Sequence, residues 1–133
     1  MEENIEILLI DDDTIIQKLH HHIFKKITNS PIKIFSNGME AKEYFDQNFS
    51  SNKNYLIFLD INMPLMNGWE FLEYCQTEYS KASIQVVILT SSPFKKDQIK
   101  ASNYNQVTFY KIKPLYKENI IEILTSLEIT CFV

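Results

Sequence analysis

Six polar side chains come directly after apolar runs of the sequence, and together they could carry phosphoryl chemistry. Several carboxylates at one edge of a sheet repel each other, and a hard divalent cation such as Mg²⁺, with oxygen ligands and retained waters, is the simplest compensation. A carboxylate beside Mg²⁺ can attack phosphorus and form an aspartyl phosphate. The six side chains are those of Asp11, Asp12, Asp13, Asp60, Thr90 and Lys113.

Three of these residues have distinct expected roles. Asp60 is the expected nucleophile and phosphorylation site. Lys113 would place a mobile positive charge beside one phosphoryl oxygen, and Thr90 would donate a hydrogen bond to another. The side chains converge only if the strands before them are parallel, because binding crevices of parallel sheets lie at the carboxyl ends of the strands.

Short apolar runs predict the strands that would position these residues. Their almost continuous apolar character is typical of parallel strands buried on both faces. The runs are Ile5 to Ile10, Ile32 to Phe35, Tyr55 to Leu59, Ile84 to Leu89, and Val107 to Ile112.

Segments with helical spacing separate and follow these runs. Ser92 and Pro93 predict the start of the fourth helix, since a serine oxygen caps free amides and proline at the first position loses no needed donor. The first helix carries an apolar stripe made of Ile15, Ile16, Leu19, Ile23 and Ile27. The others span about 39–49, 68–79, 93–103 and 116–127. Five alternations of strand and helix predict an α/β fold, a parallel sheet with helices on both faces.

Four segments of the chain resemble the receiver domains of two-component response regulators. They are Leu8-Leu9-Ile10-Asp11-Asp12, the segment from Phe58 to Gly68 with its Asp-x-x-Met-Pro-x-x-x-Gly pattern, Leu89-Thr90-Ser91, and Lys113-Pro114. The resemblance spans nearly the whole chain and implies a flavodoxin-like sheet of order 2-1-3-4-5. A length of 133 residues fits one domain, so a single, stand-alone receiver domain over residues 1–133 is expected.

The resemblance implies a function and a set of metal ligands. Mg²⁺ would be bound by Asp11, Asp12 and Asp60, with the backbone carbonyl of Asn62 as a further ligand. The phosphoryl group would come from a sensor histidine kinase or a histidine phosphotransfer protein, and a downstream protein target would respond. Self-phosphorylation and autodephosphorylation are then the expected reactions, rather than enzymatic turnover of a substrate.

The resemblance also implies a switch. Phosphorylation would draw the Thr90 hydroxyl inward, and Tyr110 would change rotamer with it. The reporting surface would lie around Tyr110 and include the fourth helix, with Lys95 and Lys96, and the last helix. A cis peptide bond between Lys113 and Pro114 is implied as well.

Several residues depart from the pattern or have ordinary alternative interpretations. Asp13 is expected to cap the first helix rather than bind metal. Ser91 replaces the small apolar residue usual in the family. Receivers usually carry a glycine before the fifth strand, so Asn103 or Asn105 would have to adopt any left-handed turn there.

Three consecutive histidines, His20, His21 and His22, could suggest a metal site or a phosphotransfer site. Consecutive helical residues point in three directions, so these imidazoles cannot easily converge on one ion. A solvated helix surface is the expected role of this run.

Composition limits the partners and the compartment. A formal net charge of −4 argues against a broad nucleic-acid or membrane surface, because both partners are polyanions. Cys75 and Cys131 are interpreted as ordinary thiols of a reducing compartment. The amino terminus has no basic n-region and its apolar run is short, so a cytoplasmic protein is expected. A monomer or weak dimer is expected, and no residue of the sequence decides between the two.

Two other functions fit part of the sequence. A haloacid-dehalogenase-like phosphatase could use Asp11 and Asp13 as its Asp-x-Asp pair, but this assignment leaves the Asp60 segment unexplained. A pseudo-receiver would keep the fold without phosphorylation, and the intact acids, Thr90 and Lys113 argue against it.

Overall fold

The computed structural model describes residues 4–91 and 94–132, and within them five parallel strands form one sheet. The strand order is β2-β1-β3-β4-β5, and every neighbouring pair is parallel. The strands are β1 (Ile5–Ile10), β2 (Ile32–Phe35), β3 (Asn54–Asp60), β4 (Ile84–Thr90) and β5 (Val107–Ile112). This arrangement confirms the predicted α/β fold and the strand order.

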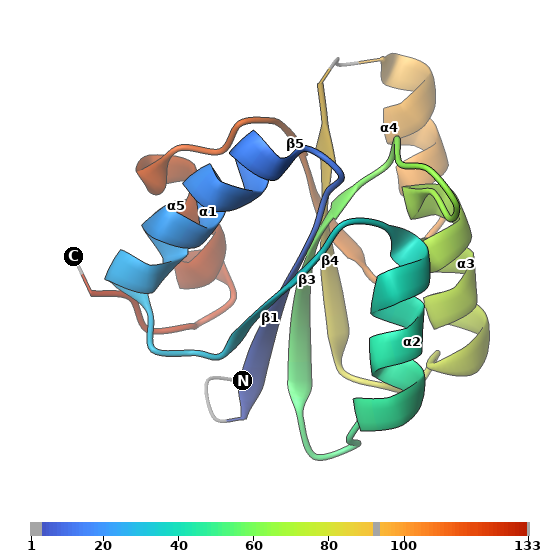
Figure 1. Ribbon diagram of the computed structural model, residues 1–133, viewed down its shortest axis with the longest axis horizontal. Coiled ribbons are helices and arrows are strands. Elements are labelled where there is room, and N and C mark those ends of the chain that lie inside the picture. The colour runs from blue at the N-terminus through green and yellow to red at the C-terminus, as the bar shows by residue number, and fades with distance from the viewer. Residues whose placement is uncertain (1–3, 92–93, 133) are drawn as a thin grey trace.

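Helices cover both faces of the sheet (Figure 1). They are α1 (Thr14–Ile27), α2 (Gly38–Asn48), α3 (Gly68–Glu78), α4 (Lys95–Ala101) and α5 (Lys117–Ser126). Helices α1 and α5 lie on one face, and α2, α3 and α4 lie on the other (Figure 1). The predicted helix start at Ser92 and Pro93 lies outside the described residues; the helix that follows begins at Lys95.

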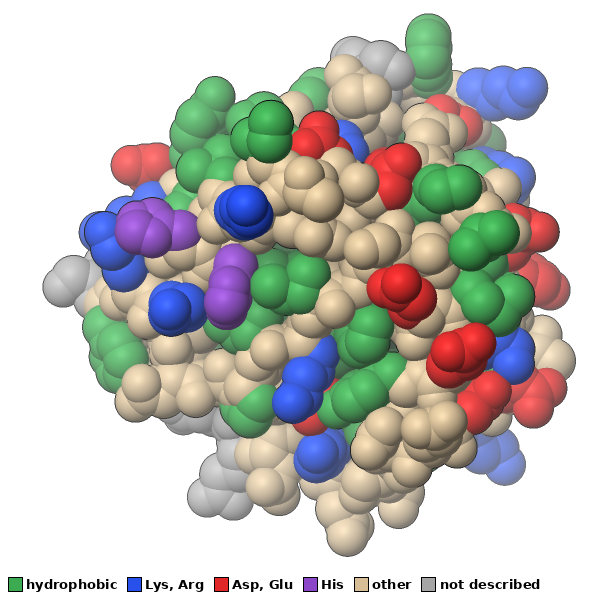
Figure 2. Space-filling view, in the orientation of Figure 1, with side chains coloured by type: hydrophobic (Ala, Val, Ile, Leu, Met, Phe, Trp, Pro, Cys, Tyr) green, Lys and Arg blue, Asp and Glu red, His purple; other side chains and the backbone are tan. Residues whose placement is uncertain are grey.

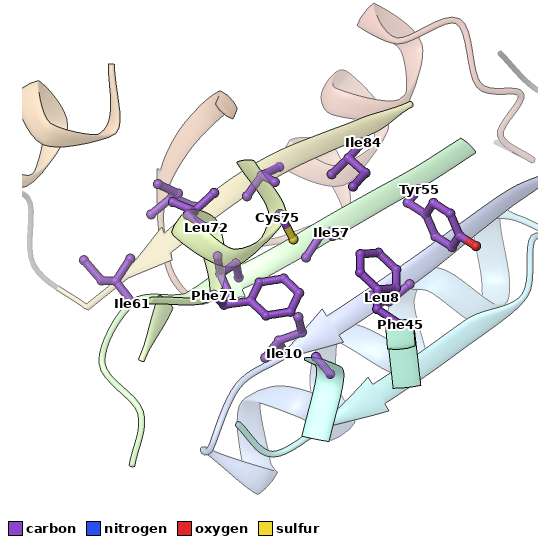
Figure 3. Packing of buried hydrophobic residues seen from close by; sticks show 14 of the residues in the cluster. Leu8, Ile10, Phe45, Tyr55, Ile57, Ile61, Phe71, Leu72, Cys75 and Ile84 are labelled. Carbon is purple, nitrogen blue, oxygen red and sulfur yellow. The ribbon is translucent and has the colours of Figure 1, made fainter. Parts of the chain in front are cut away.

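Alternate residues of the central strands belong to two separate hydrophobic cores, because successive side chains of a strand point to opposite faces of the sheet. Leu8 and Ile57 belong to the core under α2 and α3, where Phe45 and Phe71 pack against the sheet (Figure 3). The other core lies under α1 and α5 and contains Ile7, Leu9, Leu56, Phe58, Phe24 and Ile120.

Burial on both faces holds for the central strands β1, β3 and β4 but was wrong for β2 and β5. These two strands lie at the edges of the sheet, so each has a neighbouring strand on one side only. Ile34 of β2 is 38% exposed and Ile112 of β5 is 51% exposed.

Helix α1 is rotated relative to the predicted apolar stripe. Ile15 is 77% exposed, and Leu19 is also exposed. The buried face consists of Gln17, His20, Phe24 and Ile27. Two polar side chains therefore lie on the buried face in place of Ile15 and Leu19, whereas Ile27 is buried as predicted.

None of the helices in the described ranges is long and apolar enough to cross a membrane.

Candidate functional site

Three carboxylates meet at the carboxyl edge of the sheet. Asp11 and Asp12 follow β1, Asp60 ends β3, and one carboxylate oxygen of each lies within 4.8 Å of those of the other two. Asp11 and Asp60 are buried, and Asp12 is exposed. Hard oxygen donors with one side open to solvent suit Mg²⁺, which binds to few carboxylates and keeps several waters. The residues present therefore fit the ion that the sequence predicts.

The ammonium of Lys113 lies between two of these acids. Its Nζ is 3.1 Å from Oδ2 of Asp11 and 3.2 Å from Oδ2 of Asp60. Burial lowers the pKa of Lys113, but the charges and hydrogen bonds of the two carboxylates outweigh it, so the net pKa is raised and the amine is charged. Three carboxylates and one ammonium carry a formal charge of −2, which a divalent cation matches.

Asp60 is a buried acid with a raised pKa. Burial, and next the charge of Asp11, raise the pKa of Asp60 to about 6, although Lys113 and the backbone of Asn62 oppose the shift. The Asn62 N–H donates to Oδ1 of Asp60 over 3.2 Å. A buried acid held near several charges is a candidate reactive group, because functional sites are where such shifts are concentrated.

Asp13 caps α1, as predicted from the sequence. Its Oδ1 accepts hydrogen bonds from the N–H groups of Ile15 at 3.0 Å and Ile16 at 3.2 Å. The backbone N–H of Asp13 donates to Oδ1 of Asp11 over 2.9 Å, which helps to orient that carboxylate. The three consecutive acids thus divide into two that face the cluster and one that starts the helix.

Both glycines of the chain pack against the segment after Asp60. A Cβ on Gly68 would lie 2.6 Å from the carbonyl oxygen of Asp60, and a Cβ on Gly38 would lie 2.8 Å from the carbonyl oxygen of Met66. Leu65, in the same segment, has a φ of 67°. Close backbone approach therefore fixes this segment on both sides, and with it the carbonyl of Asn62.

Thr90 and Lys113 come together at the ends of neighbouring strands. Thr90 ends β4, its side chain is buried, and its carbonyl accepts a hydrogen bond of 2.8 Å from the N–H of Lys113. The Lys113–Pro114 peptide bond is cis, which confirms the implied geometry.

Tyr110 lies opposite Ile88 in the ladder between β4 and β5, half-buried against the core under α2 and α3. Burial raises the pKa of the Tyr110 phenol, and Thr90 offsets part of this rise. Lys95 and Lys96 of α4 are exposed, as expected. Neither Asn103 nor Asn105 has a positive φ, so no left-handed turn precedes β5 at these residues.

The predicted solvated surface of the histidine run was wrong for His20. His22 is exposed and His21 is half-buried, and Figure 2 shows histidine and lysine side chains gathered on the α1 side of the molecule. His20 is only 2% exposed, and its Nε2 accepts a hydrogen bond of 2.9 Å from the N–H of Leu115. A buried imidazole can replace an apolar residue at low cost when a backbone donor satisfies it.

Gln17 is a second buried residue near the site that the sequence did not reveal. Its amide donates to the carbonyl of Asp11 and to that of Phe35. The available signal was the spacing of Gln17, His20, Phe24 and Ile27, which recurs on one helix face. The apolar stripe of isoleucine and leucine in the same helix is the stronger pattern, so the spacing of Gln17 and His20 was not used.

Known proteins resemble this chain in sequence and in fold. The model of the response regulator receiver domain family matches residues 7–125. The "Probable transcriptional regulator ycf29" of Porphyra purpurea is 30% identical over 123 residues, which cover 91% of this chain and 55% of that protein. The chain spans about half the length of the first curated relatives that it matches.

Two solved structures cover nearly the whole chain. A two component response regulator from Cytophaga hutchinsonii superposes with a TM-score of 0.83 at 28% identity, over 96% of this chain and 98% of that one. A two-component response regulator from Legionella pneumophila gives a TM-score of 0.79 at 31% identity, over 93% and 98%. The chain belongs to the response regulator receiver domain family of two-component signalling systems.

Proposed function

We propose that this chain is a stand-alone response regulator, a single receiver domain over residues 1–133 that accepts a phosphoryl group on Asp60. Phosphorylation of an aspartate is general to the family. The observation that carries the proposal is the position of Asp60, a buried acid within reach of Asp11, Asp12 and the Lys113 ammonium.

The chain's own residues have separate tasks in the proposed reaction. A carboxylate oxygen of Asp60 attacks phosphorus as the bond from phosphorus to the donor's leaving atom breaks, so the leaving atom departs with the bonding electrons. Lys113 binds one phosphoryl oxygen, and the Thr90 hydroxyl donates a hydrogen bond to another. Asp11, Asp12, Asp60 and the Asn62 carbonyl would hold Mg²⁺, which supplies positive charge to the phosphoryl oxygens.

The proposed donor is a phosphohistidine on a sensor histidine kinase or a histidine phosphotransfer protein. Exposed apolar side chains on two segments that flank Asp60 support a protein partner here. Ile15, in the first turn of α1, is 77% exposed, and Leu65, after β3, is 80% exposed. Apolar groups in such positions are available to pack against a docked protein. We place the protein in the cytoplasm, as a monomer or weak dimer.

The proposed output is a change of surface around Tyr110. A phosphoryl group adds about two negative charges, and it can shift a packed element only as far as its affinities for two arrangements differ. Thr90 and Tyr110 would form that element. Exposed residues beside them, Ile99 of α4 and Ile112 of β5, support a protein-binding face for a downstream target.

Intact-mass analysis with acetyl phosphate tests the proposal. With Mg²⁺ the wild-type chain should gain one phosphoryl group that is labile to base, and Asp60→Asn should gain none. Asp46→Asn, at an exposed acid in the last turn of α2, is the matched control and should be labelled like wild type. Equal labelling of Asp60→Asn would remove Asp60 as the acceptor.

A phosphatase would behave differently in the same samples. The Asp-x-Asp interpretation requires Asp11 and Asp13 to act together, whereas the Asp13 carboxylate caps α1. Sustained hydrolysis of a phosphate ester by Asp60→Asn would favour the phosphatase over the receiver.

A further inference from the structure

Gln17 ties the end of β1 to the end of β2. Its side-chain amide donates to the Asp11 carbonyl and, over 2.9 Å, to the Phe35 carbonyl. Both partners are acceptors, so the NH₂ end of the amide must face them, and its two hydrogens account for both bonds. The same Phe35 carbonyl accepts the Asp11 N–H at 3.0 Å. Gln17 therefore fixes the backbone from which the Asp11 carboxylate projects.

His20 ties α1 to the segment after Lys113. Pro114 has no N–H, so the Leu115 amide is the first backbone donor beyond Lys113, and it donates to Nε2 of His20 over 2.9 Å. Nε2 must then be unprotonated, which requires the neutral imidazole. Burial lowers the pKa of His20 to about 4, while Asp11 raises it and Lys113 lowers it further, so the imidazole is neutral at physiological pH.

Lys113 is therefore held from both sides along the chain. On the amino side its own N–H donates to the Thr90 carbonyl, and on the carboxyl side the Leu115 N–H is bound by His20. Leu115 itself is buried, at 1% exposure. Loss of the His20 acceptor would leave a buried N–H without a partner, which is unfavourable unless the segment moves.

We infer that Gln17 and His20, three residues apart on the buried face of α1, are positioning residues for the charged groups on either side of Asp60. Gln17 acts through Asp11 and the metal, and His20 acts through Lys113 and the phosphoryl group. The inference rests on the proposed function and adds to it. One turn of α1 thus sets the geometry of two segments that are about a hundred residues apart in sequence.

Substitutions of Gln17 and of His20 should affect different steps, Mg²⁺ binding for Gln17 and phosphorylation for His20. Gln17→Met keeps the length of the side chain and removes both donors, so the Asp11 backbone loses its support. Mg²⁺ affinity, measured by isothermal titration calorimetry, should fall about 10-fold or more, as for other residues that orient metal ligands. Lys18→Met, one residue away on the exposed face of α1, is the matched control and should bind Mg²⁺ like wild type.

His20→Leu should not weaken Mg²⁺ binding, because displacement of the Lys113 ammonium leaves the carboxylates in place, but it should lower the rate of phosphorylation at saturating Mg²⁺. Displacement of a group that contacts the transferred phosphoryl can slow transfer about 10-fold or more. His20→Gln should restore the rate, because its carbonyl oxygen can accept the same N–H. His22→Leu changes an exposed histidine of the same helix and should have no effect.

If Gln17 and His20 have only a structural role, both variants should lose thermal stability, with no selective loss of Mg²⁺ affinity in Gln17→Met or of phosphorylation rate in His20→Leu. That result would overturn the inference. Equal rates for His20→Leu and His20→Gln would also overturn it. If His20→Leu does not fold, His20→Met makes the same comparison.

Failure of the proposed function would look different. A wild-type chain that is never labelled would remove the phosphorylation role, while calorimetry of Gln17→Met would still test the effect on Asp11. A crystal structure of His20→Leu would still test whether the Lys113 ammonium leaves its position between Asp11 and Asp60.

Discussion

Among the single residues of the site, Lys113 and Asp60 form its charged centre. The Lys113 side chain is 12% exposed, its ammonium contacts two buried carboxylates, and its raised pKa keeps it charged. A buried charge pair is costly unless its geometry is good and its remaining groups are bonded. The arrangement is therefore better explained by a reaction that needs these charges than by stability.

Stability should depend on pH through His20. The pKa of His20 is lowered, chiefly by burial, from 6.5 to about 4. Because the folded pKa lies below the unfolded one, the unfolded chain binds more protons between these values. The contribution is complete above pH 6.5 and falls as the pH drops, by at most about 3 kcal/mol near pH 4.

Urea unfolding at pH 7.5 and pH 4.5 measures this loss. His20→Gln keeps a hydrogen-bond acceptor without a titrating group, so its stability should fall less than that of wild type over this interval. Identical losses in the two proteins would show that His20 does not titrate as its burial implies.

Asp13 and Asp12 should separate capping from metal binding. Asp13→Ala removes a helix cap and should cost about 1 kcal/mol of stability. The variant keeps the backbone N–H that orients Asp11, so its Mg²⁺ affinity should match that of wild type. Asp12→Ala should show the reverse pattern in calorimetry and urea unfolding. Weaker Mg²⁺ binding by Asp13→Ala would assign Asp13 to the metal site.

The sequence predicted which charged residues meet at the strand ends better than it predicted the buried polar residues of α1. Asp11, Asp60 and Lys113 were recognisable because each follows an apolar run, and parallel strands bring such positions together. Gln17 and His20 carry no comparable signal, because their role depends on which backbone groups of distant loops lie opposite them.

Close packing against the first residue of α3 fixes the backbone of the segment after Asp60. A Cβ at Gly68 would contact the Asp60 carbonyl oxygen and the Ile61 Cα at 2.6 Å, and neither backbone atom can turn aside. Gly68→Ala should therefore cost about 1–3 kcal/mol through overpacking. It should also weaken Mg²⁺ binding, since the segment carries the Asn62 carbonyl.

Urea unfolding and calorimetry test this expectation. Thr77→Ala, at an exposed position of the same helix, is the control and should change neither quantity. A Gly68→Ala variant with wild-type stability would mean that the backbone yields without cost.

The orientation of α1 shows where pattern reasoning fails for an element. Hydrophobic periodicity predicted the helix and the packing of Ile23 and Ile27. It placed the first half of the apolar stripe on the wrong face, because it counts Gln17 and His20 as polar and therefore exposed. Hydrogen bonds to backbone groups reverse that assignment, and they leave Ile15 and Leu19 in solvent. The prediction of burial on both faces was also wrong for the edge strands β2 and β5, since a run of four to six residues does not reveal whether a strand has a neighbouring strand on both sides.

For the molecule as a whole, Mg²⁺ binding should stabilise the folded chain without being required for folding. Two cores on opposite faces of the sheet stabilise the fold, and the site lies at one edge of that sheet. A chelator should therefore prevent labelling without unfolding the chain. Mg²⁺ at a hundred times its dissociation constant should stabilise wild type by about 2.7 kcal/mol.

Circular dichroism in EDTA and urea unfolding with and without Mg²⁺ check both statements. Asp60→Asn should gain less from the ion than wild type. A chain that unfolds in EDTA would make the metal a structural requirement instead.

The most direct test of the central claim is to identify the modified residue chemically. The chain is incubated with acetyl phosphate and Mg²⁺ and reduced with borohydride, which converts an aspartyl phosphate to homoserine, and its peptides are then sequenced by mass spectrometry. Homoserine is expected at position 60 and an unmodified aspartate at positions 11, 12 and 13. Homoserine at another position, or none at position 60 in a folded chain that binds Mg²⁺, would rule out Asp60 as the acceptor.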